Sequence, residues 1–468
     1  MTRATLPRAS TAETLGVLAD VVVPTLAKGV ILRRPKVVAV AERFELDRRA
    51  VRRMQRLRDR YGAGPLMLRL PPGREQAVLL APGHVGRVLD ATPDPFSAAS
   101  SEKRAALSHF EPDGVLISRG PVRADRRRYN EAVLDSSCPM HHLAARFRQV
   151  VDEEAAGLVA AVERSGVLDW PAFAVAWWRA VRRVVLGDGA RDDQTVTDLL
   201  QELRADANWA FLQIRRLAIR DRFYARLDAH LARAEPGSLA AVMAQVPAHA
   251  DTAPAGQVPQ WLFAFDATAI ASFRALALLA AYADYGARAR AEAASAAGAA
   301  QGASELPLLR AAVLEAVRLW PTTPMILRQT TGDTTWEAGV MPAGTGVLIF
   351  APFFHRDDER LPYADRFAPE LWLADTTPAP GPGLPVTRGH AVGAEPATGW
   401  PLVPFSAGPA FCPGRNLALL MSSTMLAALL GPGPLRLASP APLGAAGPLP
   451  GTLDNYALRF AYAGAGGA

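Results

Sequence analysis

Apolar residues recur at intervals of three and four along most of the chain, which is the spacing that buries one face of an α-helix. Four segments show this pattern: residues 40–62, 139–290, 306–321 and 415–430. The first is rich in arginine and predicts a helix with a solvated face, while Pro321 stops the third. Trp177, Trp178 and Trp209 lie within the second segment, and we expect them in the core.

Patterns typical of β-strands are fewer and shorter. Residues 65–70 and 76–82 flank the turn-forming stretch PPGRE and predict a hairpin. Residues 346–354 have strand-like composition, and residues 455–462 place alternate apolar side chains on one face. The expected fold class is therefore mainly α with a small β portion.

Domain boundaries are not evident from the sequence. Residues 375–401 are rich in proline and glycine and predict a long irregular loop, but no linker divides the helical and strand patterns. We therefore expect a single domain over residues 1–468, in which residues 1–35 form an N-terminal extension. Half of the residues are hydrophobic and 21% are charged, which is typical of a soluble globular protein.

The charge and the N-terminal sequence exclude several classes of protein. A net charge of +6 over 468 residues is weak support for nucleic-acid binding. Residues 15–31 are apolar, but Asp20, Pro24 and Lys28 interrupt them short of the roughly 20 residues that span a bilayer. We expect an amphipathic surface helix there, no signal peptide and no membrane span. A P-loop and a Gly-rich dinucleotide motif are absent from the sequence, so nucleotide binding is not indicated.

The two cysteines, Cys138 and Cys412, are far apart in the sequence and indicate a reduced, cytoplasmic protein. His141 and His142 follow Cys138, but adjacent residues on a helix face different directions, so we do not expect a zinc site there. Cys412 has a more informative context. Phe405, Gly408, Cys412 and Gly414 form the pattern F-x-x-G-x-x-x-C-x-G, and an apolar helical segment follows at once.

The chemistry of this loop suits a metal-bound thiolate. Its glycines allow tight turns and a close approach of the backbone to a flat group. A cysteine just before a helix N-terminus has a lowered thiol pKa, because the helix dipole stabilises the thiolate. A thiolate is a suitable ligand for a soft metal.

The cysteine loop resembles the heme-thiolate signature of the cytochrome P450 family. The resemblance implies the cytochrome P450 fold, heme b as cofactor, and Cys412 as the axial ligand of the iron. Phe405, Gly408 and Gly414 would contact the cofactor as parts of the same signature. Other motifs follow the family's order, so that the resemblance extends over residues 110–430.

Two of these motifs lie on either side of Pro321. Glu315 and Arg318 match the family's E-x-x-R motif, which implies a structural ion pair on one helix face. Arg328, on an expected strand, would contact a heme propionate. The later segment FHRDDERLPYADRFAPELWL resembles the family's H-R-D and F-x-P-E stretch, with Leu371 in place of the usual arginine.

The segment RGPVRADRRRYNEAVL resembles the family's C helix. Arg127 occupies the usual propionate-binding position, and Arg123 replaces the usual aromatic residue. Arg123 could itself bind a propionate, because guanidinium pairs well with carboxylate. We expect Arg126 or Arg128 to lie on a solvated basic face. Ala410 stands where the family often has another basic residue before the cysteine.

Residues 259–285 resemble the family's oxygen-activating helix, with Thr268 in the key position and Ala264 one turn earlier over the heme. Ala267 replaces the usual acid, and Asp266 lies one residue earlier, a rotation of roughly 100° on a helix. Asp266 could reach the usual place only if the helix has a bulge. Thr268 either hydrogen-bonds dioxygen or bonds back to the preceding turn. Asp266 either donates protons or pairs with an arginine.

The resemblance implies an oxidoreductase of secondary metabolism, a monooxygenase that inserts one oxygen atom from dioxygen into a C–H or double bond of a small organic substrate. Its electrons would come from a ferredoxin and a ferredoxin reductase, with the ferredoxin docking near Arg126, Arg128 and Arg415. Two alternatives stay open. The missing acid favours a peroxide-dependent peroxygenase, and the departures at Ala267, Leu371 and Ala410 favour a non-catalytic heme-binding protein.

Overall fold

The computed structural model describes residues 5–70, 73–298, 305–373, 402–439, 443–444 and 447–462. The contacts between Cα atoms divide the chain into two compact units. The sheet unit comprises Met1–Ala105, Val317–Cys412 and Pro450–Leu453, and the helical unit comprises Ala106–Ala316, Pro413–Leu449 and Asp454–Ala468. A single domain over residues 1–468 stays a prediction. The proline-rich loop expected at residues 375–401 lies outside the described residues.

The sheet unit holds a five-stranded sheet in the order β1-β2-β8-β5-β3 and a two-stranded sheet of β6 and β7. Its strands are β1 (Leu66–Leu70), β2 (Arg74–Val78), β3 (Phe96–Ser97), β5 (Met325–Thr330), β6 (Thr334–Trp336), β7 (Gly339–Met341) and β8 (Gly346–Phe350). β1 and β2 form the expected antiparallel hairpin, with Leu66 opposite Val78. β2 pairs with β8 in parallel, and β8 pairs with β5 in antiparallel orientation.

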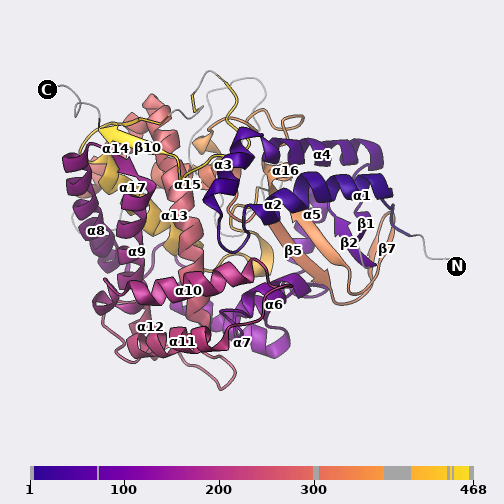
Figure 1. Ribbon diagram of the computed structural model, residues 1–468, viewed down its shortest axis with the longest axis horizontal. Coiled ribbons are helices and arrows are strands. Elements are labelled where there is room, and N and C mark those ends of the chain that lie inside the picture. Colours follow the sequence, from indigo (N-terminus) through magenta and orange to yellow (C-terminus); the bar gives the residue numbers. More distant parts are fainter. Residues whose placement is uncertain are drawn as a thin grey trace. The chain divides into compact units, whose positions relative to one another are not determined.

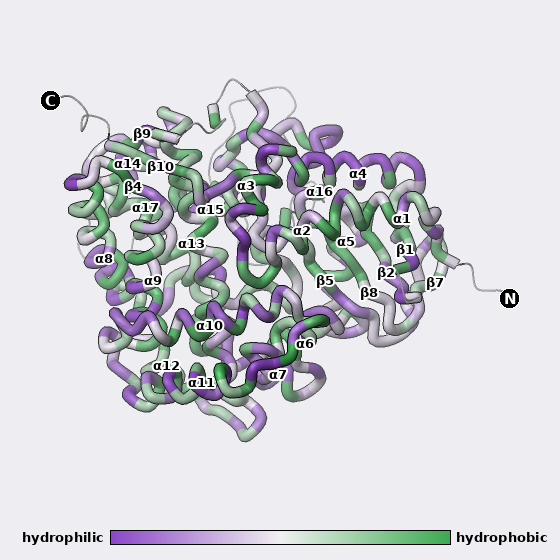
Figure 2. Tube along the Cα trace, viewed as in Figure 1, coloured by the Kyte–Doolittle hydropathy of each residue, from purple (hydrophilic) through white to green (hydrophobic). Residues whose placement is uncertain are grey.

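The sheet unit also contains helices, several of which are labelled beside its strands in Figure 1. They are α1 (Thr11–Val17), the π-helical segment η1 (Leu18–Val22), α2 (Val23–Ala27), α3 (Pro35–Arg43), α4 (Leu46–Tyr61), α5 (Pro82–Asp90), α6 (Ser101–Leu107), α16 (Ala351–His355), η5 (Pro369–Trp372) and η6 (Gly408–Ala410). The helix expected over residues 40–62 is mainly α4, which Figure 2 shows as strongly hydrophilic. Glu45, with a φ of 51°, separates it from α3.

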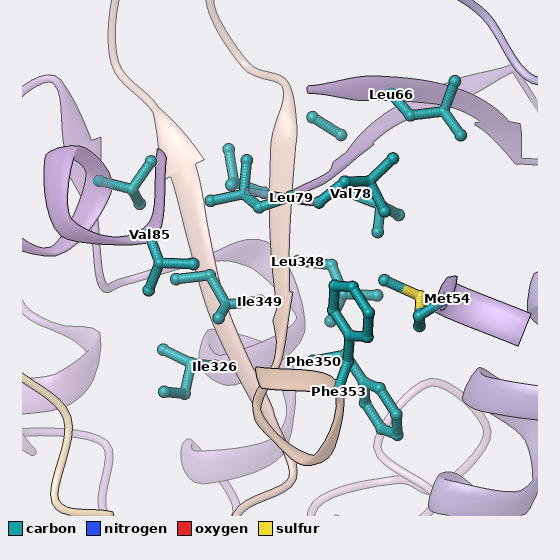
Figure 3. Close-up of a cluster of buried hydrophobic side chains, with 14 of the residues drawn as sticks. Met54, Leu66, Val78, Leu79, Val85, Ile326, Leu348, Ile349, Phe350 and Phe353 are labelled. Atoms are coloured by element: carbon teal, nitrogen blue, oxygen red, sulfur yellow. The ribbon is translucent and has the colours of Figure 1, made fainter. Parts of the chain in front are cut away.

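The core of the sheet unit lies on both faces of β8. Figure 3 shows Leu348 and Ile349 pointing to opposite sides of the strand, as the two-residue period requires. Met54 of α4 lies with Leu348 and Phe353, and Val85 of α5 lies on the side of Ile349. These residues belong to one buried apolar cluster, which explains why residues 346–350 form a strand. The expected strand over residues 346–354 is shorter, because Pro352 begins α16.

The helical unit is built mainly from long helices, as the sequence predicts. They are η2 (Val115–Ile117), α7 (Gly120–Val133), α8 (Ala144–Ser165), α9 (Trp170–Leu186), η3 (Asp188–Ala190), α10 (Gln194–Ala207), α11 (Leu217–Leu231), α12 (Leu239–Gln245), η4 (Ala255–Gln257), α13 (Val258–Ala281), α14 (Ala283–Gly298), α15 (Pro307–Leu319) and α17 (Arg415–Leu430). α15 continues into the sheet unit at Val317. A small sheet in the order β4-β10-β9 completes the unit, formed by β4 (Leu168–Asp169), β9 (Leu435–Leu437) and β10 (Arg459–Tyr462).

α13 is the central helix of this unit and packs against α9, α14 and α17. Phe273 of α13 makes ring contacts with Trp170, Phe173 and Phe460. Within the described residues, one helical stretch, residues 255–281, is long and apolar enough to cross a membrane. Because 72% of its apolar window is buried inside the protein, it has the character of a core helix.

One expectation about the helical unit is wrong and another is confirmed. Trp177 is fully buried, as expected. Trp209 is 52% exposed and lies between α10 and α11, with Phe211, Leu212 and Ile214 also exposed. The helical pattern of residues 139–290 is interrupted here, so the indole of Trp209 has no helix face to bury.

Candidate active site

The cysteine loop, residues 402–412, folds back on itself through short-range backbone hydrogen bonds. The amide of Cys412 donates to the carbonyl of Phe405 at 2.9 Å, and that of Phe411 donates to Gly408 at 3.0 Å. Ser406 and Gly408 both have positive φ values, 62° and 65°. The loop therefore turns twice within a few residues and presents Cys412 as a half-buried cysteine, three residues before α17.

Gly408 is required by the packing of this loop. A Cβ atom at residue 408 would lie 2.2 Å from the carbonyl oxygen of Leu89, at the end of α5. A non-glycine residue would also be strained at this φ. The glycine of the motif thus allows the loop to contact the backbone of α5. Gly414 has no comparable constraint, because the nearest atom to a Cβ there is Leu134 Cδ1 at 3.9 Å.

His355 of the H-R-D motif holds the beginning of the cysteine loop. Its Nε2 accepts a hydrogen bond from the amide of Val403 at 3.0 Å. The ring is fully buried, and this burial, together with nearby Arg318, lowers the pKa of His355 to about 3. The neutral imidazole is therefore the form that accepts this bond. The sequence motif indicated that this segment matters but gave no role for His355.

Two cations of the sheet unit lie together beside β5. Arg328 is 3% exposed and donates through Nε to Thr92 Oγ1 at 3.0 Å. The ammonium of Lys103 donates to the carbonyl of Leu327 at 3.2 Å. Burial and the charge of Arg328 lower the pKa of Lys103 to about 7. Sequence reasoning predicted Arg328 on a strand but missed Lys103, although a lysine is rare in this arginine-rich chain.

α7 carries arginines in very different surroundings. Arg123 is buried, and this burial, together with the charge of Arg127, lowers the pKa of its guanidinium. Arg127 donates through Nε to Glu131 at 2.6 Å. Arg128 is exposed and pairs with Asp125 at 2.8 Å.

Of the two arginines considered for a solvated basic face, Arg128 is exposed as expected and Arg126 is buried. Its side chain is buried and donates to Ser118 Oγ at 2.8 Å and to the carbonyl of Asp251 at 2.9 Å. It also pairs with Asp113 at 3.0 Å. A guanidinium with these partners connects α7 to two loops and is not available to a docking protein.

α13 is a continuous α-helix through residues 264–268, with no bulge. The hydroxyl of Thr268 donates to the carbonyl of Ala264 at 3.0 Å, so these two residues lie one turn apart on the same face. Asp266 points elsewhere and pairs with Arg204 of α10 at 2.6 Å. Of the alternatives expected for each residue, the structure therefore shows the hydroxyl of Thr268 bonded to the preceding turn and the carboxylate of Asp266 paired with an arginine.

A hydrogen bond from a neighbouring helix adds to the packing that orients α13. Trp177 of α9 donates through Nε1 to the carbonyl of Phe265 at 2.9 Å. The Phe265 ring is 5% exposed and packs edge-on against this indole. No motif in the sequence indicates this contact, because it joins residues 88 positions apart.

Glu315 and Arg318 both lie on α15 and are completely buried. The guanidinium of Arg318 donates to the carbonyls of His355 and Ala364 at 3.0 and 3.1 Å, and to that of Arg366 at 2.7 Å. Arg318 thus ties α15 to the segment that follows the H-R-D motif. The ion pair between Glu315 and Arg318 stays a prediction.

Comparisons with known proteins agree with this description. Residues 256–431 match the family model of cytochrome P450. A cyclooctat-9-en-7-ol 5-monooxygenase of Streptomyces melanosporofaciens is 32% identical over 151 residues, which are 32% of this chain and 27% of that protein. The cytochrome P450 monooxygenase oblB of Emericella variicolor is 32% identical over 27% of this chain and 20% of its own length. The matched part therefore spans much less than half of these relatives.

Solved structures show the same fold over nearly the whole chain. The crystal structure of the cytochrome P450 CYP102L1 superposes with a TM-score of 0.67 at 18% identity, covering 88% of this chain and 94% of that one. Retinoic acid-bound cyanobacterial CYP120A1 gives a TM-score of 0.64 at 17% identity, with 87% and 93% covered. The fold class is thus the mainly α cytochrome P450 fold. Residues 256–431 are therefore similar to the cytochrome P450 family in sequence, and the chain shares the cytochrome P450 fold over most of its length.

Proposed function

We propose that this chain is a heme-thiolate monooxygenase that transfers one oxygen atom from dioxygen to a small organic molecule. The observation that carries the proposal is the cysteine loop. Its backbone hydrogen bonds and the close approach of Gly408 to α5 hold a half-buried Cys412 directly before α17. A thiolate in such a loop is a suitable axial ligand for heme iron.

Heme b is the cofactor of this family, and the chemistry of the described side chains fits it. In the sheet unit, Arg328 and Lys103 bring two cations together in surroundings that disfavour the lysine charge. In the helical unit, burial and the nearby charge of Arg127 disfavour the charge of the Arg123 guanidinium. Carboxylates such as the heme propionates would stabilise both pairs of cations. We propose that these residues hold the propionates and that Cys412 binds the iron.

When bound, the heme supplies the redox chemistry that activates oxygen, and a thiolate ligand favours cleavage of the O–O bond. The side chains of the protein would orient the bound oxygen substrate and deliver protons to it. We propose that Thr268 exchanges its bond with the Ala264 carbonyl for one to the oxygen substrate, since a hydroxyl can both donate and accept. Phe405 would line the cysteine loop, and Ala264 would leave room on the α13 face. Asp266, held by Arg204, would deliver a proton only if that pair opened.

Reduction and carbon monoxide difference spectroscopy test the thiolate ligand. We expect the dithionite-reduced protein with carbon monoxide to give the spectrum of thiolate-ligated heme. Cys412→Ala should abolish this spectrum, and the matched control Cys138→Ala, which changes the exposed second cysteine, should leave it unchanged. A spectrum that survives in Cys412→Ala would contradict the proposal.

The pairing of Asp266 with Arg204 favours one alternative, a peroxide-dependent peroxygenase. Peroxide brings its own protons, so such an enzyme would not need an acid beside Thr268. Product formation with hydrogen peroxide alone, compared with dioxygen and a reductase system, distinguishes the two reactions. Product formed only with dioxygen and reductase would exclude the peroxygenase. A small molecule that changes the heme spectrum on binding but gives no product under either condition would favour a non-catalytic heme protein.

A small acidic ferredoxin, reduced by its reductase, remains the proposed electron donor of a cytoplasmic enzyme without a membrane span. The burial of Arg126 removes it from the proposed docking surface and leaves Arg128 and Arg415. Arg128→Glu should slow reduction and weaken its dependence on salt, because steering depends on the charge of the surface. Unchanged reduction kinetics in this variant would contradict docking at Arg128.

A further inference from the structure

The loop between α7 and α8, residues 134–143, brings an acid and two histidines together. Asp135 Oδ2 is 2.5 Å from His142 Nδ1 and 3.7 Å from His141 Nδ1. The same carboxylate oxygen accepts the backbone amide of His142 at 2.7 Å. The possible ligand atoms of these three residues all lie within 4.8 Å of one another. α8 begins only at Ala144, so the helical geometry that would separate adjacent histidines does not apply here.

His141 is oriented in the way that metal-binding histidines are. Its ring is buried, and Nε2 lies 3.0 Å from the carbonyl of Val133, which can only accept a hydrogen bond. Nε2 therefore carries the proton, and Nδ1, which lies 3.7 Å from Asp135 Oδ2, keeps its lone pair. A hydrogen bond from the second ring nitrogen to a carbonyl is the usual support of a metal-bound imidazole. Nδ1 now accepts the amide of Leu143 at 3.0 Å, a bond that a metal ion would replace.

His142 gives solvent access to the cluster. Its side chain is 54% exposed, whereas that of His141 is 1% exposed. The two imidazoles stack with their centroids 4.5 Å apart. An ion could reach Asp135 and His142 from solvent without an opening of the fold and then engage the preoriented His141.

We propose that Asp135, His141 and His142 form a binding site for a divalent transition-metal ion, with Zn²⁺ as the expected occupant. Two imidazole nitrogens and one carboxylate oxygen form a ligand set that zinc accepts, with water as the fourth ligand. Mg²⁺ and Ca²⁺ prefer oxygen ligands and do not suit two imidazoles. Zinc–ligand bonds are about 2.0–2.2 Å long. Because the two imidazoles stack, the exposed ring of His142 must rotate to direct a nitrogen lone pair at an ion held by His141.

The site supports the beginning of α17. Ser136 Oγ donates to the carbonyl of Pro413 at 2.7 Å, and the side-chain amide of Asn416 donates to the carbonyl of Cys138 at 2.7 Å. A metal ion that fixes Asp135, His141 and His142 would stiffen the loop that makes these contacts. Zinc binding itself does not depend on the proposed oxygenase activity and is measured separately from it.

Equilibrium dialysis of the full-length protein against Zn²⁺, followed by metal analysis, tests the site. We expect one zinc ion per chain in the wild type, with affinity at least tenfold weaker in His142→Ala and Asp135→Asn. The control His249→Ala removes another exposed histidine near an aspartate and should bind as the wild type does. Thermal unfolding should show stabilisation by Zn²⁺ in the wild type and His249→Ala only.

Two results would overturn the proposal. One is equal zinc affinity in the wild type, His142→Ala and Asp135→Asn, with all three proteins folded by circular dichroism. The other is a sulfur ligand in the zinc X-ray absorption spectrum, or loss of binding in Cys138→Ser, because either would assign the ion to the exposed thiol of Cys138. Imidazole scattering without sulfur is the expected spectrum.

Discussion

Replacing Gly408 by alanine should destabilise the cysteine loop, because the added methyl group would overlap the backbone of α5. The Cβ atom would lie 2.2 Å from the carbonyl oxygen and 2.6 Å from the carbonyl carbon of Leu89. These are backbone atoms, so no side-chain rotation relieves the overlap. The φ of 65° adds a conformational cost of about 1–2 kcal/mol for a non-glycine residue. Overpacking adds about 1–3 kcal/mol.

The expected loss is therefore about 2–5 kcal/mol in the free energy of unfolding, or a displaced loop that avoids this cost. Either outcome should reduce heme incorporation, since residue 408 lies between Phe405 and Cys412. Gly414→Ala is the matched control, because it changes the other glycine of the motif at an unstrained φ of −89° and makes only ordinary contacts. It should cost no more than about 1 kcal/mol.

Urea unfolding and the carbon monoxide difference spectrum measure the two effects. The reasoning is refuted if Gly408→Ala matches the wild type in both measurements, or if Gly414→Ala is the more damaging change. The ordering of the two variants is a sharper test than either value alone, because both glycines belong to the same sequence motif.

Three further expectations follow from charged and titratable groups. Between pH 6.5 and about 3, the unfolded chain protonates His355 whereas the folded protein does not, so stability should fall as the pH falls through this range. His355→Asn should reduce this slope in urea unfolding measured at several pH values, and an unchanged slope would contradict the buried neutral form. Asp266→Asn should lower the free energy of unfolding by about 1–3 kcal/mol, because it removes the negative charge that pairs with buried Arg204. An unchanged free energy of unfolding would show that the pair contributes little. Burial and nearby Arg328 lower the pKa of Lys103 to about 7, so the charged lysine destabilises the heme-free folded protein. Lys103→Met should therefore raise the free energy of unfolding more at pH 6, where the lysine is charged, than at pH 9. Equal gains at both pH values would mean that Lys103 is not held in its neutral form at pH 9.

Local patterns predicted the elements that depend on local sequence. The helix at residues 415–430, the hairpin after residue 65 and the position of Arg328 on a strand agree with the structure. Each has a clear signal, which is apolar periodicity, a turn sequence or a family motif. The segment at residues 346–354 was harder, because its apolar run is equally compatible with a strand and a short helix.

Contacts between distant residues could not be predicted in the same way. The partner of Asp266 is Arg204, 62 positions away, and nothing in either local sequence selects the other. Arg126 and Arg128 are nearly identical in sequence context, yet the first is buried and the second is exposed. The difference arises because residues two positions apart on a helix face different directions. Arg126 turns inward to Ser118 and the carbonyl of Asp251, whereas Arg128 stays at the surface and donates to the carbonyl of Pro247. The histidines at positions 141 and 142 meet Asp135 because their loop is not helical.

The indole of Trp177 restrains rotation of α13, because turning the helix about its axis would break the hydrogen bond to the Phe265 carbonyl. Side chains on this helix can then be exchanged to reshape a binding cavity while the axis and its angular setting stay in place. Variant libraries for a new substrate range should accordingly diversify positions around Ala264 and keep Trp177 constant. A library that changes the indole as well would remove this restraint on the setting of the helix.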